Sequence, residues 1–254
     1  GRDKGRARES ILIGLLQGTI GIVVGTHAIF QDSVAYRDLA LVVIDEQHRF
    51  GVAQRLQLAA KGRRAPHTLA MTATPIPRTL TLANYGEMDV SRLDEMPPAR
   101  QPIDTRVVAQ ERMGDVVEAV GRHIAGGQQA YWVCPMVRES ESDDIAAVEA
   151  RHAALRERFG EAVVMVHGQL RPELKDAAME RFASGAANLL VATTVIEVGV
   201  DVPAATLMVI EQAERFGLAQ LHQLRGRVGR GSEKSTCLLL RGGALSEVGR
   251  ERLA

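Results

Sequence analysis

An acidic turn directly follows a short apolar run near the start of the chain. The run Leu41–Ile44 ends at Asp45 and Glu46, which are followed by Gln47 and His48. In parallel α/β sheets, the carboxyl ends of the strands form the edge where ligands bind. A carboxylate there can hold Mg²⁺ through its water shell, and a second one can orient and deprotonate an attacking water. The pattern favours phosphate-anhydride hydrolysis, and a solvated acidic turn is the alternative for an Asp-Glu pair considered alone.

A second group of chemistry-bearing residues combines arginine with glycine. Between Gln220 and Gly231, three arginines alternate with three glycines. Arginine presents a planar guanidinium that matches phosphate oxygens, and glycine lets the backbone approach a polyphosphate closely. An arginine that reaches across a cleft stabilises a phosphoryl group in transfer only when the cleft is closed. We predict this arginine-finger arrangement, and a basic loop that contacts RNA or an acidic protein is the alternative.

Hydroxyl side chains follow several other apolar runs. The run Leu69–Met71 leads into Thr72 and Thr74, with two prolines directly after them. Beside the acidic turn, such a turn can relay hydrogen bonds, while a helix start capped by Thr74 is compatible with the same residues. Threonines also follow the runs Ile22–Val24 and Leu189–Ala192.

Short apolar runs alternate with helical patterns along the whole chain. Runs of this kind are typical of strands that are buried on both faces, so the alternation predicts a parallel α/β sheet. The predicted strands are Ile20–Val24, Leu41–Ile44, Leu69–Met71, Val107–Ala109, Ala130–Val133, Val163–Val166, Leu189–Ala192, Leu207–Ile210 and Thr236–Leu240. The predicted helices are Arg6–Gln17, Val52–Lys61, Arg112–Ala125, Ile145–Phe159, Glu173–Ala183 and Leu218–Arg225.

The composition restricts partners and location. Lysine plus arginine balances aspartate plus glutamate at 31 each in 254 residues, so any contact with DNA must be local. Cys134 and Cys237 lie in apolar runs, which predicts buried, reduced thiols in a cytosolic protein. The apolar runs are far shorter than the ~20 residues that cross a bilayer, so we expect a soluble protein without a membrane partner.

The acidic and hydroxyl turns resemble motifs of superfamily 2 helicases. Asp45 to His48 resembles motif II, the Walker B box, and its continuation Arg49–Val52 is shared by RecG-like translocases and the transcription-repair coupling factor. Thr72 to Leu80 resembles motif III of the RecG-like translocases over its whole length. The resemblance implies that Asp45 positions Mg²⁺ and that Glu46 is the general base. It also implies that four residues couple nucleotide state to the second domain: Gln47, His48, Thr72 and Thr74.

Four further segments resemble motifs of the same superfamily. Gly25–Ala28 resembles motif Ib, Val166–Gly168 motif IVa, Ala192–Pro203 motif V, and Gln220–Gly231 nearly the full length of motif VI. The resemblance implies DNA contacts by Thr26, His27, His167, Gly168, Thr193 and Thr194. It implies that Gly199 and Asp201 face the nucleotide across an interdomain cleft, and that the γ-phosphate group consists of Gln223, Arg227 and Arg230.

Nearly the whole chain, from about Arg2 to Leu240, resembles the RecG-like DNA translocases. Gln129–Pro135, Glu211–Leu218 and Pro97–Ile103 resemble this family more than the coupling factor. The resemblance implies two RecA-like parallel-sheet domains, the first of them incomplete. Because the proline-rich stretch Asp94–Pro102 cannot continue a helix, we expect a first domain over 1–98, a linker over 99–110 and a second domain over 111–254.

The same resemblance implies a motor that uses ATP and Mg²⁺ to remodel branched DNA, such as stalled forks and Holliday junctions, in recombination and repair. It implies a bacterial, cytoplasmic and nucleoid-associated protein with a single-stranded-DNA-binding protein as a further partner. Two alternatives remain: the coupling factor, which would bind RNA polymerase, and a non-hydrolysing module that binds DNA or protein. The intact pairs Asp45–Glu46 and Arg227/Arg230 argue against the module.

The sequence contains no Gly-x-x-x-x-Gly-Lys-Ser/Thr segment, the backbone cradle and lysine that bind nucleotide phosphates. The chain also begins at Gly1 without a methionine. We therefore expect a piece of a longer protein, with Walker A and a DNA-splitting wedge before Gly1 and a duplex-coupling segment after motif VI. The 254-residue chain by itself is expected to be inactive as an ATPase.

Overall fold

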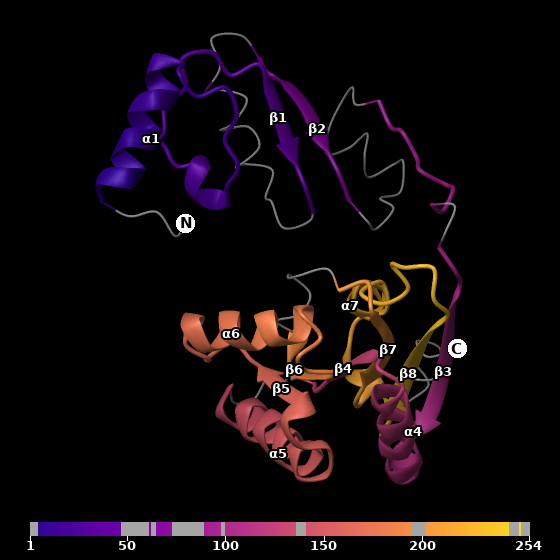
Figure 1. Ribbon diagram of the computed structural model, residues 1–254. Coiled ribbons are helices and arrows are strands. Elements are labelled where there is room, and N and C mark those ends of the chain that lie inside the picture. Colours follow the sequence, from indigo (N-terminus) through magenta and orange to yellow (C-terminus); the bar gives the residue numbers. More distant parts are fainter. Residues whose placement is uncertain are drawn as a thin grey trace. The chain divides into compact units, whose positions relative to one another are not determined.

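The computed structural model describes residues 5–46, 61, 65–72, 89–97, 100–135, 141–194, 202–243 and 249 (Figure 1). The chain divides into two compact units, Gly1–Arg92 and Leu93–Ala254, each with a sheet of its own. Every pair of strands in both sheets is parallel. The predicted parallel α/β architecture is therefore confirmed.

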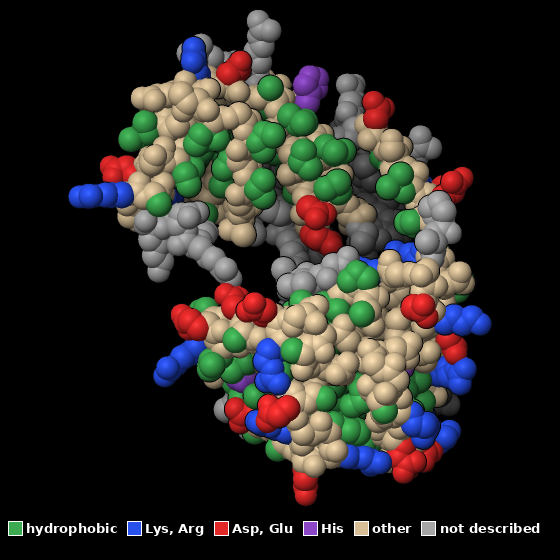
Figure 2. All heavy atoms as spheres, viewed as in Figure 1, with side chains coloured by type: hydrophobic (Ala, Val, Ile, Leu, Met, Phe, Trp, Pro, Cys, Tyr) green, Lys and Arg blue, Asp and Glu red, His purple; other side chains and the backbone are tan. Residues whose placement is uncertain are grey.

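Unit 1 contains helix α1 (Arg6–Gln17), a 3-10 turn η1 (His27–Ile29) and the strand pair β1 (Leu41–Ile44) and β2 (His67–Ala70). Val42 and Ile44 pack with Phe30 in a small core, while the alternate residues Leu41 and Val43 are 59% and 53% exposed. Figure 2 shows hydrophobic side chains gathered on one face of this unit. The core of unit 1 therefore lies on one side of the strand pair.

The predicted strand Ile20–Val24 is wrong. These residues pair with no strand in the described part of unit 1, and Ile22 and Val24 are 85% and 92% exposed. The backbone N–H of Ile20 instead donates to the carbonyl of Gly14 at 3.3 Å, and the Ile20 side chain lies against Gly14. The start of the apolar run therefore completes the end of α1. Apolar, β-branched composition does not form a strand without a paired neighbour.

Unit 2 is built on a six-stranded sheet with helices on both faces (Figure 1). The order of the strands in space is β3 (Ile103–Ala109), β8 (Ser235–Arg241), β7 (Ala205–Ile210), β4 (Gln129–Val133), β6 (Leu189–Ala192) and β5 (Val163–Val166). The helices are α4 (Met113–Ala125), α5 (Glu141–Phe159), α6 (Pro172–Ala183) and α7 (Leu218–Arg225).

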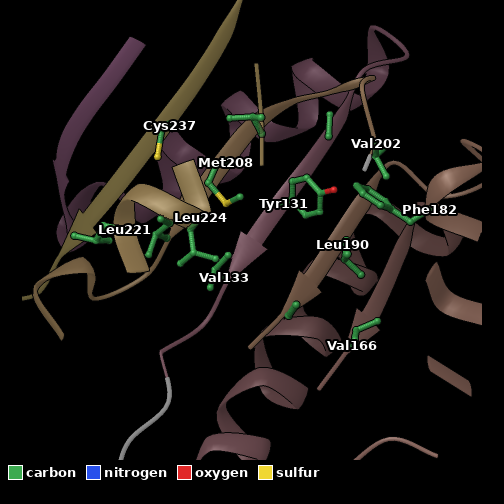
Figure 3. Packing of buried hydrophobic residues seen from close by; sticks show 14 of the residues in the cluster. Tyr131, Val133, Val166, Phe182, Leu190, Val202, Met208, Leu221, Leu224 and Cys237 are labelled. Atoms are coloured by element: carbon green, nitrogen blue, oxygen red, sulfur yellow. The ribbon is translucent and has the colours of Figure 1, made fainter. Parts of the chain in front are cut away.

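The buried residues of unit 2 form one cluster on each face of the sheet. Alternate strand residues such as Trp132 pack with α4 and α5, while their neighbours Tyr131 and Val133 pack with α6 and α7. Figure 3 shows the second cluster, in which Phe182 of α6 and Leu224 of α7 meet the sheet. Because successive strand residues point to opposite faces, strands that are apolar throughout are buried on both sides.

The predicted linker is partly a strand. Residues 103–109 form β3, which pairs with β8 from Ile103 opposite Ser235 to Ala109 opposite Arg241. The two compact units also divide between Arg92 and Leu93, earlier than the boundary expected at residue 98. The proline-rich stretch therefore leads directly into an edge strand of the unit 2 sheet, because a distant partner, β8, supplies the hydrogen bonds.

The other predicted strands and the described helices are confirmed, with ends that differ by a few residues. The predicted helix Val52–Lys61 lies outside the described residues, apart from Lys61. Both cysteines are buried and free, as expected, and burial raises the pKa of the Cys237 thiol to about 12. In the described part of the chain, no helix combines the length and apolarity needed to cross a membrane.

Candidate functional site

The acidic turn lies directly at the carboxyl end of β1. Ile44 is buried, whereas Asp45 is exposed and Glu46 is half-buried. The backbone N–H of Glu46 donates to Asp45 Oδ1 at 2.9 Å, and Glu46 has a φ angle of 50°. Left-handed backbone is uncommon for residues other than glycine and costs about 1–3 kcal/mol. A strand that is buried on one face only, and not on both as predicted, therefore holds two carboxylates in a strained turn, which is typical of functional sites.

Thr72 lies beside this turn. Ile44 is opposite Ala70 in the parallel pair, and the Met71 N–H donates to the Ile44 carbonyl at 2.8 Å. Glu46 and Thr72 thus follow neighbouring strands at equivalent positions. The structure brings together the acidic turn and the first hydroxyl of the predicted coupling turn. The other predicted coupling residues lie outside the described residues: Gln47, His48 and Thr74.

The two residues predicted to contact DNA in unit 1, Thr26 and His27, lie where the chain enters η1. Thr26 is exposed, and its carbonyl accepts the Ile29 N–H at 3.1 Å. The Ile29 carbonyl in turn accepts the Tyr36 hydroxyl at 2.8 Å, and the next residue, Phe30, packs on β1. The turn is therefore tied to the strand that carries the acidic residues. The side chain of His27 lies outside what the structure describes.

Two of the predicted DNA contacts of unit 2 follow neighbouring strands. His167 comes directly after β5 and Thr193 directly after β6, and the Thr193 N–H donates to the Val166 carbonyl at 3.3 Å. Both side chains are buried, and His167 Nδ1 has no hydrogen-bond partner among the described residues. Buried polar atoms rarely lack a partner, so a ligand oxygen at this edge would complete its hydrogen bonding. Gly168 is exposed here, and Thr194 is half-buried.

Residues 226–231, which we call the arginine loop, follow α7. Leu224 at the end of α7 and Val228 in the loop are both fully buried, so the loop is anchored in the core of unit 2. Arg227 is half-buried and Arg230 is exposed, and Arg230 Nε donates to the Gly226 carbonyl at 3.2 Å. Gln223 lies one helical turn before Arg227. The three residues predicted to sense the γ-phosphate therefore lie on one helix end and its loop.

Glu211, an important residue at the same sheet edge, is not predicted from the sequence. It follows β7 and is 6% exposed. Arg151 of α5 donates to both of its carboxylate oxygens, through Nε at 2.5 Å and Nη2 at 3.0 Å, and Trp132 Nε1 donates to Oε1. Burial and then the charge of Glu211 raise the pKa of the nearby Cys134 thiol. The available signal was a carboxylate directly after a buried run, the same pattern as Asp45 after β1.

We expect Arg151→Met to destabilise unit 2 by about 2–3 kcal/mol, because it leaves the buried Glu211 carboxylate without its bidentate partner. Urea denaturation measures this change. Arg158→Met on the same helix is the matched control, since Arg158 is 51% exposed and lies 4.0 Å from Glu118. It should cost less than about 0.5 kcal/mol. If the two variants lose equal unfolding free energy, the buried pair Arg151–Glu211 contributes no more to stability than an exposed ion pair.

Two predicted nucleotide-facing residues, Gly199 and Asp201, lie outside the described residues. Among the residues that are described, no group of three or more His, Cys, Asp or Glu side chains forms a metal cage. Magnesium needs no such cage, since one or two carboxylates together with substrate phosphates and waters complete its octahedral shell. The exposed Asp45 carboxylate fits that kind of binding.

The chain matches two family models. The model described as DEAD/DEAH box helicase matches residues 2–82, and the model described as helicase conserved C-terminal domain matches residues 111–232. The two matches fall on different units, with residues 83–110 between them. The order of the two models along the chain agrees with the order of the motifs in the sequence.

Curated relatives cover the whole chain. It is 52% identical over 259 residues to the ATP-dependent DNA helicase RecG of Escherichia coli O157:H7, covering 100% of this chain and 37% of the relative. It is 51% identical to the helicase of the same name in a Synechocystis species, covering 94% of this chain and 29% of the relative. The chain thus spans 37% and 29% of the length of these two relatives.

Solved structures agree with both comparisons. A structure of RecG bound to a three-way DNA junction is 43% identical and has a TM-score of 0.73, covering 99% of this chain and 32% of that one. The Saccharomyces cerevisiae protein Dbp5 bound to RNA and ADP–beryllium fluoride is 14% identical, with a TM-score of 0.61 and 89% of this chain covered. At that identity the second likeness shows a shared fold and nothing more.

Proposed function

Because this chain belongs to the RecG family of superfamily 2 helicases, we propose that it supplies the catalytic turns of an ATP-driven motor that remodels branched DNA. The observation that carries the proposal is the strained acidic turn at the carboxyl end of β1, with Thr72 just after the end of the neighbouring strand β2. Branched DNA as the substrate is supported by the likeness to the structure of RecG on a three-way junction.

The acidic turn divides the chemistry of hydrolysis between two carboxylates. Asp45, which is exposed, would hold Mg²⁺ through water, and the ion would neutralise developing charge on the nucleotide phosphates. Glu46 would accept the proton of the attacking water as it approaches the γ-phosphate. The two carboxylates would thus serve different partners, the metal ion and the attacking water.

The arginine loop would complete the site from unit 2. Arg227 and Arg230 carry permanent positive charges that can stabilise the phosphoryl group in transfer. Gln223, one turn earlier on α7, would orient the same phosphate by hydrogen bonding. Hydrolysis would then require unit 2 to approach the nucleotide, which couples turnover to movement. Gly199 and Asp201 would face the nucleotide beside this loop.

DNA contacts would come from strand ends in both units. Thr26 directly precedes η1 in unit 1 and His27 begins it, and Thr193 with His167 follow adjacent strands in unit 2. Hydroxyl, imidazole and backbone N–H donors bind phosphate oxygens without reading the base sequence. Gly168 would add a backbone contact, and Thr194 a second hydroxyl. Such contacts suit a motor that moves along DNA of any sequence.

The experiment for this function uses a RecG-family protein of full length that contains this chain, referred to below as the full-length protein. We expect it to convert a three-way junction into duplex products in an ATP- and Mg²⁺-dependent reaction, measured by gel electrophoresis of labelled DNA. The 254-residue chain alone should show no DNA-stimulated ATPase, because its sequence lacks the Walker A cradle. Robust turnover by the chain alone, or a full-length protein inert on junctions, would contradict the proposal. A single-stranded-DNA-binding partner and a nucleoid location stay predictions from family resemblance.

A further inference from the structure

The segment that leads from unit 1 into unit 2 is fastened to the arginine loop. Arg100 Nε donates a hydrogen bond to the carbonyl of Gly229 at 3.1 Å, across a sequence separation of 129 residues. Gly229 lies between Arg227 and Arg230, the two arginines assigned to the γ-phosphate. A charged donor makes this bond stronger than one between neutral groups. One side chain from the linking segment thus holds the backbone of the loop at its centre.

A second contact from the same segment reaches the same glycine. Gly229 has a φ angle of 72°, and a Cβ atom added there would lie 2.9 Å from Ile103 Cγ1 and 3.6 Å from Ser235 Cβ. Ile103 is the first residue of β3 and is opposite Ser235 in the β3–β8 pair. The loop backbone is therefore packed against the start of the edge strand, in a conformation that favours glycine.

Arg100 is itself held in place. Its backbone N–H donates to the Pro97 carbonyl at 2.9 Å, so the arginine lies in a turn of the proline-rich stretch. Its side chain is partly buried, and both of its partners belong to unit 2. Arg100 therefore reaches the loop from a hydrogen-bonded backbone position within unit 2.

We propose that Arg100 is a positioning residue for the arginine loop. By holding the Gly229 carbonyl, it fixes the position of the loop backbone that carries Arg227 and Arg230. Ile103 supports the same backbone from the side. Phosphoryl transfer is sensitive to the placement of its stabilising charges, and a shift of about 1 Å can cost roughly a hundredfold in rate. The inference rests on the proposed role of the arginine loop in ATP hydrolysis. It adds that the loop acquires its geometry from Arg100 and Ile103, which lie near the start of unit 2.

The test compares variants of the full-length protein in a steady-state ATPase assay with DNA present. Arg100→Met keeps most of the side-chain stem but removes the donor, and we expect kcat to fall roughly 10- to 100-fold while KM for ATP changes less than about twofold. Arg100→Lys retains a charged donor and should recover part of the loss. Arg106→Met is the matched control, because Arg106 lies on β3, is 68% exposed and pairs with Asp104. Its kcat should stay within about twofold of the unchanged protein.

The outcomes separate this inference from the proposed function. If Arg230→Ala keeps full turnover, the proposed function of the loop fails. If Arg230→Ala loses turnover but Arg100→Met does not, the positioning role alone is overturned. A loss of kcat in Arg106→Met equal to that in Arg100→Met would also overturn it, since a merely structural effect of the segment would explain both. In a background that lacks both arginines, Arg227→Ala with Arg230→Ala, Arg100→Met should cause no further loss of the residual single-turnover rate, and an additional 10-fold loss would mean that Arg100 acts elsewhere.

Discussion

Replacing Glu46 by Gln in the full-length protein is expected to lower the kcat for ATP roughly 10²- to 10⁴-fold, the range that general-base catalysis contributes. Glutamine keeps the shape and the hydrogen-bonding reach of glutamate but cannot accept a proton at neutral pH. Because the substitution is isosteric, the left-handed turn at φ 50° should persist, and the affinity for junction DNA should change less than about twofold. ATPase rates and fluorescence anisotropy with labelled DNA measure the two effects.

The control for this variant is Glu9→Gln, because Glu9 is an exposed carboxylate on α1 of the same unit. Its turnover should match that of the unchanged protein. Full turnover in Glu46→Gln would remove Glu46 as the base and leave the acidic turn as a metal-binding feature only. Loss of DNA affinity in parallel with turnover would instead point to a collapsed unit 1.

Arg230→Ala is expected to lower kcat about 10³- to 10⁵-fold, as loss of an arginine finger does in related phosphoryl transfers. The reason is that the guanidinium stabilises charge on the phosphoryl group in the transition state, when the site is closed. Nucleotide binding before closure should persist, so the dissociation constant for a fluorescent ADP analogue should change less than about threefold. Arg230 is exposed in the structure, so its removal should leave the core of unit 2 intact.

Arg215→Ala serves as the matched control, since Arg215 is an exposed arginine in the 3-10 turn before α7. Its kcat should be unchanged within about twofold. If Arg215→Ala and Arg230→Ala lose turnover equally, a general loss of positive charge near α7 explains the effect. If nucleotide affinity falls as far as turnover in Arg230→Ala, the residue contributes to ground-state binding rather than to the transition state.

Local patterns predict several elements of this chain because short-range interactions determine them. The helices α1 and α7 have the predicted bounds, and each contains a stretch whose periodicity and flanking glycines mark a helix without reference to distant residues. The strand β1 is also predicted correctly, since a short apolar run ends abruptly in charged residues. The nature of the acidic turn can be read from the same four-residue pattern, Asp45 to His48.

Predictions fail where pairing with distant residues decides the outcome. Ile20–Val24 has the composition of a strand, but its first residue caps α1 and no described strand pairs with it. The expected linker 99–110 contains the predicted strand Val107–Ala109, and β8 also pairs with the residues before it, so the edge strand begins at Ile103. In both cases the composition of the segment is the same whether or not a partner strand lies beside it. Local patterns therefore cannot decide whether the segment forms a strand or where the strand begins.

The sequence by itself contains the residues on which the proposed chemistry depends: carboxylates after an apolar run, hydroxyl turns, and arginines alternating with glycines. Each of these lies within a few consecutive residues, where residue type and spacing carry the information. The tertiary structure alone decided which residues distant in the sequence come into contact. It placed Thr72 beside Glu46, tied Arg151 to Glu211 across 60 residues, and fastened Arg100 to Gly229 across 129. Such contacts depend on strand order and register, which arise when the whole sheet packs and not from any one segment.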